Sequence, residues 1–156
     1  MMTRPPLLAA ILLLAACREP DMVAPPQDPQ QVSYAPELRV DLSRMTRTQS
    51  GVYYEDVRVG AGEVAEAGDT IRLLYAGYLP DGTLVEARLT PEEAAPVVLG
   101  GGAIIAGWNE GIPGMRAGGR RKLVVPPELG FGSVGRRPVP PNTVLVFDIE
   151  ILPDAR

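Results

Sequence analysis

Histidine is absent from this sequence of 156 residues, and cysteine occurs once. A serine or cysteine nucleophile is usually activated by a histidine base, and histidine is also the commonest ligand of transition metals in proteins. A redox centre of the CxxC type needs two cysteines. These absences exclude triad catalysis, a histidine-ligated metal and a dithiol centre. We therefore predict no metal and no nucleotide or redox cofactor, so any chemistry must proceed without them.

Basic residues are fewer than acidic ones, which gives the chain a formal net charge of −4. Nucleic acid binding depends on a basic surface, so we expect no nucleic acid partner. The 17 glycines and 17 prolines exceed average usage and indicate many turns with little helix. The length leaves room for one modest β-rich domain, which we expect to be monomeric.

The first residues have the pattern of a targeting signal. Arg4 precedes an apolar run from Leu7 to Leu14, which is too short to span a bilayer. The next residues, Ala15-Ala16-Cys17, complete a segment that resembles the lipobox of bacterial lipoproteins. This resemblance implies removal of residues 1–16 and lipidation of Cys17, and therefore a membrane anchor. Arg18 favours the outer membrane, facing the periplasm; the alternative is an ordinary secretory signal followed by a chance cysteine.

A stretch rich in proline and glutamine follows the cysteine. It lacks an apolar period, so we predict that residues 17–48, with the acylated cysteine at their start, form a flexible tether. The alternative is that residues 32–45 add a strand or short helix to the domain, or bind a partner. The domain itself is predicted over residues 49–156.

Several short segments rich in β-branched and aromatic residues are bounded by turn signals. The segment 143–152 alternates most clearly, with an apolar set at 145, 147, 149 and 151 and a polar set that predicts a solvated face. We expect the segments at 52–59 and 70–79 to be neighbours in an antiparallel sheet. The predicted strands are 52–59, 70–79, 83–86, 97–99, 120–125 and 143–152.

One segment has helical periodicity. Ile104, Ile105, Trp108 and Ile112 would form one apolar stripe on a helix of about two turns, ending near Gly111. A single sheet must bury its apolar face against another element. We therefore predict an α+β fold, in which one antiparallel, half-wrapped β-sheet packs on one short α-helix.

Four blocks in register resemble FKBP-type peptidyl-prolyl isomerases, from about Ser50 to the end of the chain. Gly107-Trp108-Asn109-Glu110-Gly111 with the following Gly114 to Gly118 is similar to the central helix and turn of that family. The remaining blocks are Leu74-Tyr75-Ala76-Gly77 with Asp81-Gly82-Thr83, then Pro126 to Gly132, then Val139 to Leu152.

The resemblance implies an apolar proline pocket, and it assigns residues to that pocket. Tyr75, Trp108, Phe147 and Ile105 are implied as catalytic, and the Ile105 backbone N–H would hold a substrate carbonyl. The implied substrate-binding residues are Val85, Glu86, Val97, Ile104, Phe131 and Val139.

Departures from the family pattern predict a wider and less aromatic pocket. Val85 and Ala95 stand where phenylalanine is usual, and Phe131 replaces a tyrosine whose hydroxyl contacts the substrate. The loop at 133–138 carries Arg136 and Arg137, which are either a solvated pair or a contact for acidic substrate segments.

The resemblance thus implies an enzyme that rotates X-Pro bonds in proline-containing polypeptides and assists the folding of extracytoplasmic proteins. An apolar pocket that strips water from the amide would suffice for this reaction. The alternative is a catalytically weak, membrane-tethered module that binds proline-containing peptides or acts as a chaperone.

Overall fold

A computed structural model describes residues 23–94 and 96–153 of the chain. The predicted signal peptide, the predicted lipidation site Cys17 and the predicted pocket residue Ala95 lie outside the described residues. Within the described ranges, no helix combines the length and the apolar character needed to cross a bilayer.

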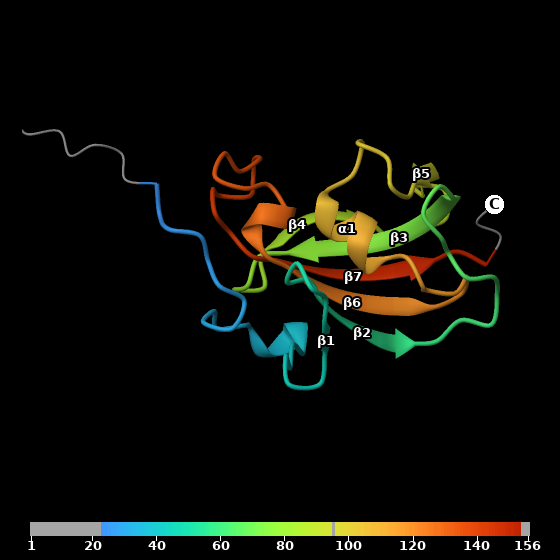
Figure 1. The fold of residues 1–156 in the computed structure, drawn as a ribbon, viewed down its shortest axis with the longest axis horizontal. Coiled ribbons are helices and arrows are strands. Elements are labelled where there is room, and N and C mark those ends of the chain that lie inside the picture. The colour runs from blue at the N-terminus through green and yellow to red at the C-terminus, as the bar shows by residue number, and fades with distance from the viewer. Residues whose placement is uncertain (1–22, 95, 154–156) are drawn as a thin grey trace, which may run out of the picture.

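Seven antiparallel strands form the sheet, in the order β1-β2-β6-β7-β3-β4, with β5 paired to β3 (Figure 1). The α-helix α1 lies against one face of the sheet, and η1 and η2 are short 3-10 helices. The predicted α+β class, with its single half-wrapped sheet, is confirmed. The elements are η1 (Pro36–Leu38), β1 (Thr46–Arg47), β2 (Tyr53–Arg58), β3 (Thr70–Tyr78), β4 (Leu84–Arg88), β5 (Pro96–Val98), α1 (Ala106–Gly111), β6 (Arg120–Val125), η2 (Pro127–Leu129) and β7 (Leu145–Ile151).

The predicted pairing of the first two long strands is wrong. β6 and β7 lie between β2 and β3, so these two strands are not neighbours. The connection between them is not a tight hairpin, because its backbone bonds to the segment that follows α1. Gly62 donates to the Ala117 carbonyl at 3.0 Å, and Ala65 donates to the Met115 carbonyl at 2.7 Å. The chain therefore crosses the end of the sheet before it enters β3.

The helix is shorter than its apolar stripe predicted. Ile105 has extended backbone angles, φ −63° and ψ 149°, and precedes the first helical residue. Ile104 also lies outside the helix, and both side chains are only half-buried. Apolar residues that line an open cleft have the same spacing as residues on a buried helix face, so periodicity alone extended the helix by two residues.

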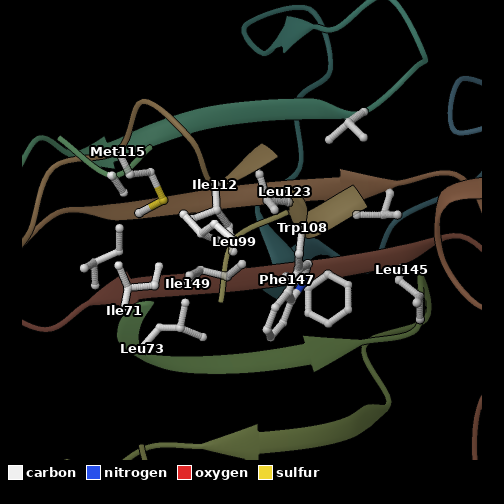
Figure 2. Close-up of a cluster of buried hydrophobic side chains, with 14 of the residues drawn as sticks. Ile71, Leu73, Leu99, Trp108, Ile112, Met115, Leu123, Leu145, Phe147 and Ile149 are labelled. Carbon is white, nitrogen blue, oxygen red and sulfur yellow. The ribbon is translucent and has the colours of Figure 1, made fainter. Parts of the chain in front are cut away.

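The main core lies between α1 and the sheet, and Figure 2 shows its side chains converging from both. Two glycines of α1 allow this close packing. A Cβ on Gly107 would lie 2.4 Å from the Val125 side chain, and a Cβ on Gly111 would lie 2.8 Å from the Leu123 side chain. The helix can therefore approach β6 more closely than any larger residue would permit. Buried members of this core include Ile71, Leu73, Leu99, Trp108, Ile112, Leu123, Phe147 and Ile149.

A buried arginine fastens the end of α1 to the sheet. Arg121 forms two hydrogen bonds to the Asp56 carboxylate, at 2.7 and 2.9 Å, and its Nη1 donates to the Gly111 carbonyl at 2.8 Å. Its guanidinium also lies 4.5 Å from the centre of the Tyr54 ring. One side chain thus joins β2, β6 and the last residue of the helix.

The N-terminal segment, defined as residues 23–48, packs on the opposite face of the sheet. Leu38 and Met45 are buried there in a second apolar cluster with side chains from four strands. In Figure 1 this segment, blue to cyan, runs beside the left half of the sheet. The strand residues that it contacts are Tyr53, Val124, Val144, Val146 and Tyr78, with Val144 just before β7.

The prediction of a flexible tether is therefore corrected for the described part of residues 17–48. Gln27 accepts a hydrogen bond from the Val144 backbone N–H at 2.9 Å, and Ala35 donates to the Pro80 carbonyl at 2.8 Å. The alternative was that this region adds a strand or short helix to the domain, and the structure has the short helix η1 and the strand β1 there. The solvated face predicted from the polar set of β7 is confined to its distal half, where Asp148 pairs with Lys122 at 2.7 Å.

Candidate active site

A cleft of about 600 Å³ opens between the start of α1, the middle of the sheet and the chain after η2. Its walls come from segments far apart in sequence, which the antiparallel order brings together. The residues that line it are Tyr75, Val85, Glu86, Gly102, Ala103, Ile104, Ile105, Ala106, Trp108, Gly130, Phe131, Arg136, Leu145 and Phe147.

Three aromatic rings form the floor of the cleft. Trp108 lies edge-on to Tyr75 and to Phe147, with ring centres 4.8 Å and 5.3 Å apart and interplanar angles of 78° and 81°. Such edge-to-face pairs are favoured by the ring quadrupoles and hold each ring in place. Gly77, opposite Phe147 in the sheet, leaves room for that ring, because a Cβ there would lie 2.6 Å from its Cε1 atom.

The Tyr75 hydroxyl is already engaged within the protein. It donates a hydrogen bond of 2.9 Å to Oε1 of Glu86, on the adjacent strand β4. Burial, with help from this bond, raises the pKa of Tyr75 to about 12. The same Glu86 oxygen lies 3.8 Å from Nη2 of Arg88. The phenol is therefore neutral at physiological pH.

One rim of the cleft is formed by the chain after η2. Phe131 lines the cleft with a ring that offers no hydrogen bond donor, and the Arg136 guanidinium lies 5.5 Å from the centre of that ring. A second hollow of about 190 Å³ adjoins this rim and is lined by Val85, Glu86, Phe131, Arg136, Arg137, Pro138 and Val139. The two hollows share Val85, Glu86, Phe131 and Arg136.

The structure brings most of the predicted site residues together. Tyr75, Val85, Glu86, Ile104, Ile105, Trp108, Phe131 and Phe147 all line the cleft. Val139 lines the adjoining hollow and is buried, with 4% of its surface exposed. Their roles in substrate binding and catalysis remain predictions.

Val97 does not line the cleft, so the structure corrects its predicted place. It pairs with Ile71 at the start of β3, whereas the cleft lies near Tyr75. Its half-buried side chain packs against the main core. The short strand that carries Val97 is separated from the cleft along the length of β3, and spacing in the sequence could not reveal this.

Leu145 and Arg136 line the cleft but were not among the predicted site residues. Leu145 belongs to the same alternating face of β7 as Phe147, so the period of two contained the signal. Arg136 was recognised as a basic loop residue, but its contact with Phe131 depends on the path of the loop. In the described ranges, no group of three or more acidic or cysteine side chains is placed to hold a metal ion.

Comparison with known proteins agrees with this geometry. A family model described as FKBP-type peptidyl-prolyl cis-trans isomerase matches residues 62–152. The chain belongs to this family. The protein is therefore a peptidyl-prolyl cis–trans isomerase, and enzymes of this family act on proline-containing peptides.

Relatives of this FKBP-type isomerase include bacterial proteins of two sizes. The FK506-binding protein of Neisseria meningitidis serogroup B is 40% identical over 103 residues, which are 65% of this chain and 94% of the relative. FkpA of Escherichia coli K12 is 40% identical over 105 residues, or 67% of this chain but 38% of FkpA.

Solved structures agree with the same fold. The crystal structure of AtFKBP13 superposes with a TM-score of 0.64 at 33% identity, covering 69% of this chain and 96% of that one. The crystal structure of FkpA from Escherichia coli superposes with a TM-score of 0.67 at 36% identity, covering 77% of this chain and 55% of FkpA.

Proposed function

We propose that this isomerase accelerates X-Pro rotation by transferring the proline amide from water to the aromatic floor of the cleft. Rotation breaks amide resonance, at a barrier of about 18–20 kcal/mol. The planar amide has charge-separated character that water stabilises and that the twisted transition state partly loses. A dry, apolar surface therefore favours the twisted state over the planar one.

The arrangement of the three rings is the observation that carries this proposal. The indole nitrogen of Trp108 is fully buried, so the ring turns only carbon toward the cleft. The Tyr75 hydroxyl is bonded to Glu86. A proline ring placed on this floor would meet apolar surface, and no group there needs to exchange a proton with the substrate.

A backbone donor at the start of α1 would position the substrate. No acceptor for the Ile105 backbone N–H is found among residues 23–94 and 96–153. Ile105 lines the cleft. A substrate carbonyl that accepts this bond would fix the peptide chain while the proline end rotates, which restrains the amide without a charged catalyst.

The test is the cis-to-trans rate of a proline tetrapeptide with the full-length chain in mild detergent, compared with the Phe147→Ala variant. Loss of the Phe147 ring removes one wall of the floor, so we expect kcat/KM to fall about tenfold or more, since each 1.36 kcal/mol is a factor of ten. Leu123→Ala is the matched control, because Leu123 is equally a core residue but lies outside the cleft.

Both variants lose stability, so each is assayed at a temperature where circular dichroism shows it folded. Selective loss of turnover in Phe147→Ala would support desolvation on the aromatic floor. Equal losses in both variants would contradict it. Peptide binding without acceleration by the unmodified chain would instead favour a weakly catalytic binding module.

We further propose that the protein is a monomeric lipoprotein, anchored at Cys17 in the outer membrane and facing the periplasm, where it assists folding of extracytoplasmic proteins. The motif Leu14-Ala15-Ala16-Cys17 supports the anchor, and the similarity to FkpA is consistent with a periplasmic role. Because residues from about 27 onward pack on the domain, only a short stretch separates it from Cys17. The ten residue steps from Cys17 to Gln27 reach roughly 35 Å when fully extended, so the domain would work near the membrane.

Mass spectrometry of the N-terminal peptide and membrane fractionation test the anchor. We expect acyl chains on the cysteine and recovery with outer membranes, and we expect Cys17→Ser to abolish both. An unmodified Cys17 in a soluble periplasmic fraction would contradict the anchor while leaving the isomerase activity untouched.

A further inference from the structure

We propose that Arg136 gives this isomerase a preference for prolines that have an aspartate or glutamate within two residues. The inference rests on the proposed function of the cleft, and it names the class of peptide that the cleft selects. It is carried by the position of Arg136, by its lack of a carboxylate partner and by the charge around it.

Arg136 is held at the junction of the two hollows. Its guanidinium lies 5.5 Å from the centre of the Phe131 ring, in a cation–π contact. Its backbone N–H donates to the Val139 carbonyl at 3.0 Å, and Gly135 donates to the Phe131 carbonyl at 3.1 Å. Gly135 has φ +68°, a conformation that allows this tight return of the chain. The loop therefore presents the guanidinium toward both hollows.

No carboxylate lies within 4.0 Å of Arg136 or Arg137 in the part of the chain that the structure describes. Glu86, the carboxylate that lines the cleft, already accepts from the Tyr75 hydroxyl and has Arg88 3.8 Å away. The positive charges at this rim are therefore in excess of the negative ones. A guanidinium without a carboxylate partner, next to a peptide cleft, favours a carboxylate from the substrate.

The local charge is opposite in sign to that of the whole molecule. The chain has a net charge of −4, so the positive rim is a departure from its average surface. Such a local field raises the concentration of acidic peptides at the cleft and repels basic ones. Arg136 is exposed to solvent, so salt screens the effect and a gain of about two- to fivefold is expected, as for other exposed ion pairs.

The test measures kcat/KM of the full-length chain in detergent for matched peptides that carry Glu, Gln or Lys at each of the two positions on either side of the proline. We expect the Glu peptide to exceed the Gln peptide about two- to fivefold at one or more positions, and the Lys peptide to be slowest there. At an ionic strength of about 1 M the difference should disappear, because the Debye length falls to about 3 Å.

Two variants assign the effect to its residue. Arg136→Gln should bring the Glu-to-Gln ratio to about one, and Arg136→Glu should invert it. Arg44→Gln removes the same charge from the N-terminal segment, where Arg44 lies 3.5 Å from Glu55, and should leave the ratio unchanged.

Equal rates for Glu and Gln peptides at every position, or a preference that survives in Arg136→Gln, would overturn the inference. The Gln peptide serves as the reference for activity itself. If the unmodified chain accelerates isomerisation of neither the Glu nor the Gln peptide, the proposed function fails. Acceleration of both peptides at equal rates overturns only the preference for acidic peptides.

Discussion

Replacing Leu38 with alanine tests whether the N-terminal segment is part of the folded domain. Leu38 ends η1, is 3% exposed and packs in the second apolar cluster on the back of the sheet. Truncation of such a buried leucine to alanine lowers the free energy of unfolding by about 2–5 kcal/mol. Its neighbours Val32, Tyr34 and Val40 are only partly buried and can relax into the space, so the lower half of that range applies. We expect a loss of about 2–3 kcal/mol.

Thermal unfolding by circular dichroism, in the same buffer for every variant, measures this loss. At roughly 4 °C per kcal/mol for a domain of this size, Tm should fall by about 8–12 °C. Val23→Ala is the matched control, because Val23 belongs to the same segment but is 57% exposed, and it should leave Tm within about 1 °C. If Leu38→Ala were as silent as Val23→Ala, the segment would be a free tether and the packing argument would be refuted.

Four further predictions concern the cleft and its support. Tyr75→Phe removes the donor to Glu86, which should lower kcat/KM modestly, by about 0.5–1.5 kcal/mol in transition-state free energy, in the peptide assay. Burial raises the pKa of Tyr75 to about 12, so the stability linked to its proton is complete below about pH 10 and is lost as pH rises through about 12. Ultraviolet absorbance follows ionisation of the phenol, and unfolding is measured at the same pH values. Ionisation of Tyr75 near the ordinary pKa of tyrosine would contradict this. Gly77→Ala places a Cβ 2.6 Å from the Phe147 ring, so activity should fall although the chain still folds, at a cost of about 1–3 kcal/mol; unchanged turnover would show that the ring position is not critical. Arg121→Lys loses the bidentate hydrogen bonds to the Asp56 carboxylate on β2, so the free energy of unfolding measured in urea should fall by about 3 kcal/mol. A fall of less than about 1 kcal/mol would mean that a lysine satisfies the same partners.

The strands of the domain could be predicted from local sequence because their pattern and their turns agree. In β7 the residues on the helix face are apolar and alternate with Asp148 and Glu150, and the segment before β4 has the turn sequence Pro80-Asp81-Gly82. The order of the strands in the sheet was harder to predict from the sequence. The wrong pairing of β2 with β3 arose because adjacency in sequence is a common guide to adjacency in a sheet, and the crossing at residues 59–69 bonds to a segment fifty residues further along.

The packed N-terminal segment was missed because its apolar residues follow no period and lie among prolines. A signal for it nevertheless exists in the strands that it covers. Leu123-Val124-Val125 and the run from Val144 to Phe147 are apolar at consecutive positions, so both faces of the sheet are buried there. A strand with one solvated face alternates, whereas a continuous apolar run indicates cover on both sides. Only one helix was predicted to pack on the sheet, so the segment that buries the other face of the sheet had to come from elsewhere in the chain.

The floor and the rim of the cleft differed in how far they could be predicted, and the reason is physical. Trp108 and Phe147 are fixed by α1 and β7, whose hydrogen bonds determine where each ring points, so their places follow from register. Arg136 belongs to a loop, where one glycine with a positive φ decides which way the guanidinium turns. The chemistry of X-Pro rotation depends on the floor, and discrimination between peptides depends on the rim. The part of the site that sequence predicts least well is therefore the part that we expect to determine which prolines this isomerase selects.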